Sequence, residues 1–290
     1  MTSFVSLPAP RVGQPAQARP VLLAVAHGTA HRAGIAELES LTARVRALAP
    51  DVPVRLAFVD HEPPSVNRAL AELAGAGAAV AAIPLLLTAA SHSKGDIAGS
   101  VRLARSEHPG FRVVYGRPLG ADPLLLSVLS DRLAAVDAEP STAVVLAAAG
   151  AADPDANAEI YRAARLLWEY RGGGAPVEVA YASATTPTVA EAIGRLRRLG
   201  HHDIVVAPYF LAPGRLPSSV GAVAGAAGAR VAGVLGAHDD VARLLLARYT
   251  EALGDPVLMN CDTCLYRAPW PGHEHKVGAA QRPHPHPAGS

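Results

Sequence analysis

Short apolar runs alternate with longer amphipathic stretches along most of the chain. Three runs in the first half have the length and aliphatic content of buried strands: Val21–Ala26 (VLLAVA), Val54–Val59 (VRLAFV) and Val80–Leu87 (VAAIPLLL). A helical stretch, Gly34–Leu48, separates the first two. This alternation predicts an α/β fold with a small parallel sheet and helices on both of its faces.

The same order of elements occurs a second time. The matching segments of the second half are Ala143–Ala148, Asn157–Tyr170, Val177–Ala182 and Ile204–Leu211. Each half is expected to end in its own helix, Pro123–Ala135 and Val241–Leu253. The repeat predicts two similar tandem domains, residues 20–138 and 139–254, with a flexible leader (1–19) before them and an irregular tail (255–290) after them.

Composition supports a folded protein and excludes several classes. Half of the 290 residues are hydrophobic and 18% are charged, so a sizeable core is available. The formal net charge of +1 does not favour a nucleic-acid or membrane partner. The apolar stretch Ala78–Ala90 is too short to span a bilayer, and the leader lacks the apolar segment of a signal peptide. We therefore expect a cytoplasmic protein.

Three polar residues follow strands of the first half. His27 follows the first strand, Asp60 the second, and His92 lies just past the third. Because ligands of such sheets bind beyond the carboxyl ends of the strands, these side chains are expected to share one cleft. Imidazole is a common ligand of Co²⁺ and Fe²⁺, and a nearby carboxylate can take up protons.

The second half provides an internal control. It has Ala149 and Ser183 where the first half has His27 and Asp60, and a shortened loop near Leu216 in place of His92. A single histidine at a strand end is commonly a turn residue. The scaffold is kept while all three polar groups are lost, which favours a functional role in the first half.

These residues stand in segments that resemble a known family. The segments are Ala26-His27-Gly28-Thr29, Phe58-Val59-Asp60, Pro84–Leu87 and His92-Ser93-Lys94-Gly95-Asp96-Ile97. They resemble the sirohydrochlorin chelatases, which are class II chelatases and include long cobaltochelatases of cobalamin synthesis and ferrochelatases of sirohaem synthesis. The resemblance implies a lyase that inserts Co²⁺ or Fe²⁺ into sirohydrochlorin without a nucleotide. It assigns metal binding and catalysis to His27 and His92.

The resemblance is less direct for the neighbouring acidic residues. Relatives often have Glu in place of Asp60, which is one methylene shorter. We retain Asp60 as a catalytic candidate. Asp96 is interpreted as an N-cap of the following helix.

The tetrapyrrole substrate carries carboxylates around an apolar ring, so its pocket needs cations at the rim. The candidates by position are Lys94, Arg32 and Arg215.

The tail contains both cysteines of the chain. Cys261 and Cys264 form a Met-x-Cys-x-x-Cys motif that resembles the C-terminal extension of the long cobaltochelatases, where it is associated with an iron–sulfur centre. Two cysteines cannot complete a four-thiolate site within one chain. His284 and His286 alternate with prolines, and both metal handling and a tail without function remain open.

Two other functions are alternatives. A non-catalytic tetrapyrrole- or metal-binding protein, such as a chaperone or sensor, fits the same pattern. A metal-dependent hydrolase would need more carboxylates near the histidines. No Walker A or dinucleotide-binding glycine motif occurs. The choice between cobalt and iron, and between monomer and homodimer, stays open.

Overall fold

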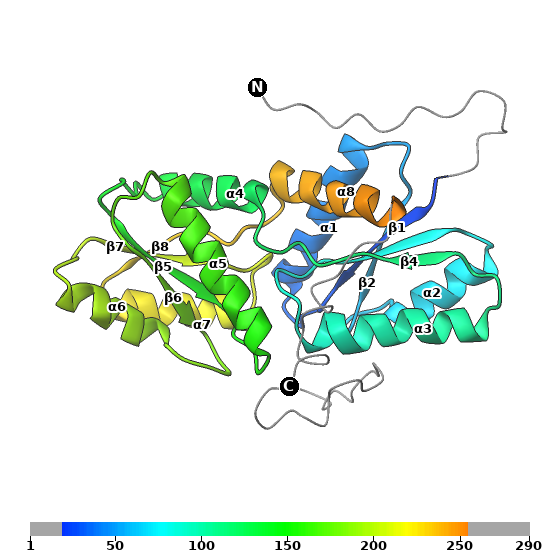
Figure 1. Cartoon of the computed structure of the whole chain (residues 1–290), viewed down its shortest axis with the longest axis horizontal. Coiled ribbons are helices and arrows are strands. Elements are labelled where there is room, and N and C mark those ends of the chain that lie inside the picture. The colour runs from blue at the N-terminus through cyan, green and yellow to red at the C-terminus, as the bar shows by residue number, and fades with distance from the viewer. Residues whose placement is uncertain (1–18, 255–290) are drawn as a thin grey trace.

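The computed structural model describes residues 19–254, which form two parallel sheets of four strands (Figure 1). The first has the order β2-β1-β3-β4 and the second β6-β5-β7-β8. The strands are β1 (Val21–Ala26), β2 (Val54–Phe58), β3 (Val80–Pro84), β4 (Val113–Tyr115), β5 (Ala143–Ala148), β6 (Val177–Tyr181), β7 (Ile204–Pro208) and β8 (Arg230–Val231). The predicted fold class, two tandem α/β units, is confirmed.

Helices cover both faces of each sheet, and each central strand has its alternate residues in two separate cores. In β1, Leu22 and Ala24 face the core that contains α1 and α8, whereas Leu23 and Val25 face the core beneath α2 and α3. The helical elements are α1 (Arg32–Leu48), α2 (Val66–Gly75), the π-helix η1 (His92–Ile97), α3 (Ala98–Glu107), α4 (Pro123–Ala134), α5 (Pro154–Tyr170), α6 (Val189–Arg198), α7 (Arg215–Ala226) and α8 (Asp239–Leu253).

The internal repeat extends to details of the backbone. The amide of Asp60 donates to the carbonyl of His27 (2.9 Å), and the amide of Ser183 donates to the carbonyl of Ala149 (3.0 Å). A cis proline peptide follows each of these turns, at Pro63-Pro64 and at Thr186-Pro187. The structure therefore places Ala149 and Ser183 where the first half has His27 and Asp60.

The two closing helices are exchanged between the lobes. We expected each half to end in a helix of its own. Instead α4 packs on α5 and β7 of the second lobe, and α8 packs on α1, β3 and β4 of the first (Figure 1). Both helices bury an apolar stripe in one continuous core that contains Leu129 of α4 and Leu245 of α8. The exchange ties the lobes together and holds the strand ends of both toward one cleft.

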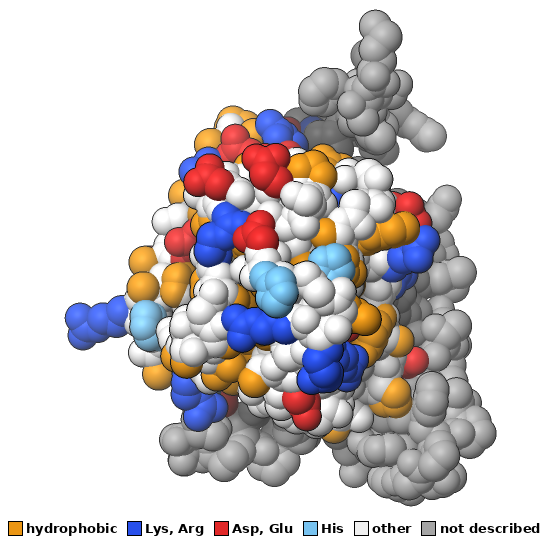
Figure 2. Space-filling model, turned by 90° about the vertical axis from the view of Figure 1, so that its left-hand side faces the viewer, with side chains coloured by type: hydrophobic (Ala, Val, Ile, Leu, Met, Phe, Trp, Pro, Cys, Tyr) orange, Lys and Arg blue, Asp and Glu red, His pale blue; other side chains and the backbone are white. Residues whose placement is uncertain are grey.

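Two further properties concern the charged surface and the helices of the described residues. On the face of the molecule in Figure 2, acidic and basic side chains are interspersed and neither sign covers the face. Within residues 19–254, no helix combines the length and the apolarity that a membrane span requires. The expected leader (1–19), apart from its last residue, and the expected tail (255–290) lie outside the described residues.

Candidate functional site

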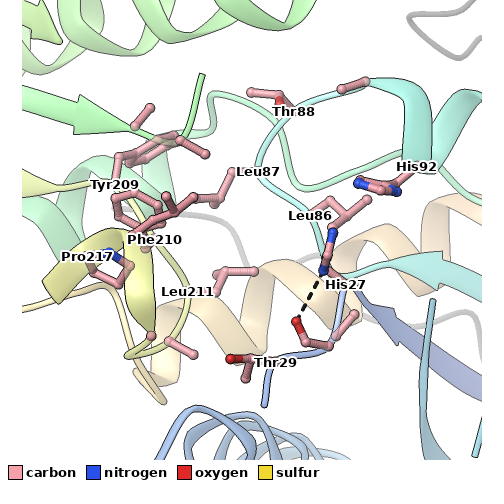
Figure 3. A pocket seen from close by; sticks show the side chains of 18 of the residues that line it. His27, Thr29, Leu86, Leu87, Thr88, His92, Tyr209, Phe210, Leu211 and Pro217 are labelled. Atoms are coloured by element: carbon pink, nitrogen blue, oxygen red, sulfur yellow. Dashed lines mark hydrogen bonds between the residues drawn. The ribbon is translucent and has the colours of Figure 1, made fainter. Parts of the chain in front are cut away.

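A cleft of about 910 Å³ lies between the carboxyl ends of the two central strands, β1 and β5. Its walls come from both lobes and are mainly apolar. Leu85, Leu86 and Leu87 follow β3 on one side, and Tyr209, Phe210 and Leu211 follow β7 on the other (Figure 3). A cavity of this size with apolar walls suits a large, flat organic ligand.

His27 and His92 face one another at one end of this cleft (Figure 3). Their ring centroids are 4.3 Å apart and the ring planes are at 90°. The turn after β1 presents His27, and the first residue of η1 presents His92. Because β1 and β3 are neighbours in the sheet, the residues that follow them meet at the same edge, as the sequence predicted.

Each imidazole has a hydrogen-bond partner on its Nδ1 atom. His27 Nδ1 lies 3.2 Å from the carbonyl oxygen of Gly28, and His92 Nδ1 lies 2.8 Å from Oδ2 of Asp96. Both partners are oxygens that can accept from Nδ1. A ring with its proton on Nδ1 has Nε2 as its candidate metal-binding nitrogen.

Asp96 is therefore oriented differently from the sequence interpretation. We expected it to cap the following helix. The residue before α3 is Ile97, which has no capping side chain, while the Asp96 side chain turns back to His92 within η1. In this π-helical turn the two side chains lie on the same face, and Asp96 holds the imidazole in place.

Asp60 contacts a neighbouring histidine, His61, which the sequence pattern did not predict as a site residue. Its Oδ1 accepts from the backbone amide of His61 (2.8 Å), and its Oδ2 lies 3.6 Å from His61 Nε2. The ring of His61 lines the cleft, 6.2 Å from the ring of His27. Two features of the sequence could have indicated a role for His61. It follows Asp60 directly, and the second repeat has Ala184 at the position that corresponds to His61.

The number of possible protein ligands is small. Within the described residues, no group of three or more His, Cys, Asp or Glu is arranged to hold a metal ion. A divalent ion on His27 and His92 would thus keep several coordination positions for water or for ring nitrogens.

The three predicted rim cations lie in different places. Arg215, the first residue of α7, lines the cleft, and its side chain is exposed. Arg32, the first residue of α1, is exposed but is absent from the lining. Lys94 is 1% exposed, and its ammonium binds Asp153 at 2.6 Å. That burial removes Lys94 from contact with a ligand in the cleft, contrary to our expectation.

The second lobe contributes a wall without histidines. Tyr209 lies against this wall, and burial raises the pKa of its phenol, with a further rise from the charges of Glu159 and Asp122. The tyrosine therefore stays neutral and serves as an apolar surface with a polar edge. In the cleft, this lobe forms the wall that lies across from the His27–His92 pair.

Known proteins resemble the chain over both repeats. The CbiX family model matches residues 21–136 and 143–252. A sirohydrochlorin cobaltochelatase of Priestia megaterium is 34% identical over 228 residues, which are 74% of this chain and 74% of that protein. A sirohydrochlorin ferrochelatase of the same organism is 28% identical over 205 residues, covering 69% of this chain and 76% of that protein.

A solved structure has the same architecture. SirB from Bacillus subtilis with Fe³⁺ superposes with a TM-score of 0.71 at 23% identity, over 84% of this chain and 98% of that one. At this identity the likeness concerns the fold.

Proposed function

The chain belongs to the CbiX family, and from this premise we propose that its inter-lobe cleft inserts a divalent metal ion into sirohydrochlorin. The observation that carries the proposal is the pair of rings, His27 and His92, at 4.3 Å between centroids and facing an apolar cavity of about 910 Å³. The family relatives named above are chelatases for this ring, and nothing found favours a non-catalytic binding protein.

The reaction exchanges two protons for one metal ion. A divalent ion enters the ring, two pyrrole N–H bonds break, and two protons leave, so charge is conserved without a nucleotide. His27 and His92 hold the ion through Nε2 while the flat ring lies against the leucine and aromatic walls. Transfer follows as ring nitrogens replace the imidazoles in the coordination sphere.

The departing protons need an acceptor beside the ring. We assign this role to Asp60, acting with His61, because the His61 ring lines the cleft and the Asp60 carboxylate lies 3.6 Å from its Nε2. A carboxylate next to an imidazole orients the ring so that it can accept a proton and pass it on. Ser183 and Ala184 occupy the equivalent positions of the second lobe, which supports a one-sided site.

The test is anaerobic incubation of the protein with sirohydrochlorin and Co²⁺ or Fe²⁺, followed by absorption spectroscopy. We expect conversion of many equivalents of ring per chain, faster than with metal alone. His27→Ala and His92→Ala should abolish it, whereas His201→Ala, outside the cleft lining, should not. Retention of full activity in both cleft variants would refute the site. A change limited to one equivalent per chain would indicate a binding protein.

Cobalt is the metal that we propose. Identity is higher to the cobaltochelatase than to the ferrochelatase, 34% against 28%, and the tail resembles that of long cobaltochelatases. Imidazole ligands alone do not separate these ions, since both bind nitrogen donors. A ratio of kcat/KM for Co²⁺ over Fe²⁺ well above one would support this choice, and a ratio below one would reverse it.

Cys261 and Cys264 lie outside the described residues, and we retain an iron–sulfur centre there as a proposal. Two thiolates supply half of the ligands of a typical cluster, so a second chain or other residues would have to supply the rest. Anaerobic purification with iron and sulfide analysis tests this. Loss of a visible charge-transfer band in Cys261→Ala would support it, and absence of iron from the intact chain would exclude it.

The active unit is proposed to be a single chain in the cytoplasm. Both walls of the cleft come from one polypeptide, so no second copy is required to close it. Light scattering at assay concentration tests the monomer, and fractionation of the producing cells tests the location.

A further inference from the structure

Lys94 is a buried cation in η1, the short helix that begins with His92. It stands two residues after His92 in η1, and its side chain is 1% exposed. Its ammonium bonds Oδ2 of Asp153 at 2.6 Å and lies 3.4 Å from Oδ2 of Asp155. Both carboxylates belong to the start of α5, in the opposite lobe. The helix that carries His92 is thus joined to the second lobe by an ion pair removed from water.

The rest of η1 is held by its own lobe. The hydroxyl of Tyr115, on β4, donates to the carbonyl of Ser93 at 2.6 Å. Asp96 bonds the His92 ring from within the same turn. Lys94 provides the cross-link from this short helix to α5.

Comparison of the two halves separates this contact from the general closure of the lobes. Glu159 on α5 accepts from the backbone amides of Ala121 and Ala89, and its counterpart Glu37 on α1 accepts from the amide of Ala237 at 2.5 Å. The bonds to Ala121 and Ala237 are equivalent in the two halves. Asp153, in contrast, has His31 at the equivalent helix start. The carboxylate that binds Lys94 therefore exists on one side, opposite the lobe that has the histidines.

We propose that the second lobe positions the metal site through the Lys94–Asp153 pair, which makes Lys94 a positioning residue for His92. The inference rests on the proposed function, because it assigns metal binding to His27 and His92. A buried ion pair contributes little net stability once desolvation is counted, and its attested use is to fix one arrangement. Here the fixed arrangement is the approach of His92 to His27, whose rings lie at 90°.

The experiment measures Co²⁺ affinity without the tetrapyrrole, by anaerobic titration of the visible bands of Co²⁺. Lys94→Met is expected to weaken binding about tenfold, as loss of outer-shell support does at other metal sites. In turnover it should raise KM for the metal and leave kcat nearly unchanged.

Arg248→Met is the matched control. Arg248 is also a buried cation that joins the lobes, bonding the helix-capping Asp122 at 3.0 Å, but it lies on α8 and bonds no residue of η1. Its loss should lower Tm and leave Co²⁺ affinity unchanged. Equal loss of affinity in Arg248→Met would show that any weakening of the lobe contact suffices, and would overturn the special role of Lys94.

Lys94→Met/Asp153→Asn removes both charges and keeps a residue that can cap α5. The single substitution leaves a buried acid without its cation and can fail to fold for that reason, whereas the double variant is expected to fold. We expect the double variant still to bind Co²⁺ about tenfold more weakly than the wild type. If the double variant binds Co²⁺ as tightly as the wild type, the weaker binding of Lys94→Met is caused by the unpaired acid, and the proposal is overturned. If Lys94→Met binds Co²⁺ as tightly as the wild type while His92→Ala loses binding, the positioning role of Lys94 is also overturned, and the proposed function stays intact. Wild-type affinity in both His27→Ala and His92→Ala would instead refute the proposed function.

Discussion

His92 Nδ1 and Asp96 Oδ2 are 2.8 Å apart within one turn of η1, and Asp96 is almost completely buried. The carboxylate fixes both the tautomer and the direction of the ring. Asp96→Asn should therefore lower kcat/KM about tenfold, and Asp96→Ala up to about a hundredfold, with the main effect on metal binding. Initial rates at varied Co²⁺ measure this.

Asp131→Asn provides the comparison for that prediction. Asp131 Oδ2 lies 3.1 Å from His238 Nε2, so this variant also removes a carboxylate from a histidine, outside the cleft lining. Its activity should equal that of the wild type. If Asp96→Asn is as active as Asp131→Asn, the carboxylate does not support the metal site.

Gly28 is the turn residue that brings His27 into the cleft. Its φ is +95°, and an added Cβ would lie 1.9 Å from the carbonyl oxygen of Asp60. Gly28→Ala should therefore cost about 1–2 kcal/mol for the left-handed backbone and about 1–3 kcal/mol more for the overlap. Gly77→Ala isolates the first term, because φ there is +66° and nothing lies within 4 Å of the added atom. Urea unfolding of both variants measures the difference, and equal losses would contradict the close approach.

Glu159 predicts a dependence of stability on pH. Burial raises the pKa of its carboxyl above the ordinary value, against the lowering effect of the Ala121 and Ala89 amides. The folded state thus binds this proton more tightly than the unfolded state, and the contribution of Glu159 to the free energy of unfolding falls as pH rises from about 4.5 through the raised pKa. Glu159→Gln lacks this loss. In urea titrations, the free energy of unfolding of this variant minus that of the wild type should therefore increase from pH 4.5 to pH 7.5, which means that the variant becomes relatively more stable. A constant difference would show that the carboxyl is not perturbed.

Local sequence patterns predicted much of the fold and the centre of the site. The strands are short apolar runs, and their alternation with helices indicated parallel sheets. His27 and His92 could be paired because they follow strands that become neighbours. The correspondence of His27 with Ala149 also follows from the repeat, and the backbone bonds of the structure reproduce it.

The remaining features depend on contacts between distant segments. The apolar stripe of α8 does not specify which lobe it covers, so its exchange with α4 could not be predicted. The sequence indicates an exposed cation at Lys94, because its partner Asp153 is 59 residues away in the other repeat and cannot be identified from local patterns. His61 differs in that its feature is local: its backbone φ is +68°, a turn conformation that the sequence does not indicate for a histidine.

Arg215 and Arg32 permit a direct test of how the cleft recognises carboxylates. Both are exposed first residues of helices, α7 and α1, yet Arg215 lines the cleft and Arg32 does not. A guanidinium at the rim pairs with a carboxylate of the ring in a charge-assisted contact. Arg215→Met should raise KM for sirohydrochlorin about five- to tenfold, which corresponds to about 1–1.4 kcal/mol. Because the metal ligands are untouched, kcat at saturating ring should stay the same. Arg32→Met should leave both constants unchanged in the same assay. A KM that rises equally in the two variants would indicate a diffuse effect of net charge, and the rim contact would then have to be assigned to another residue.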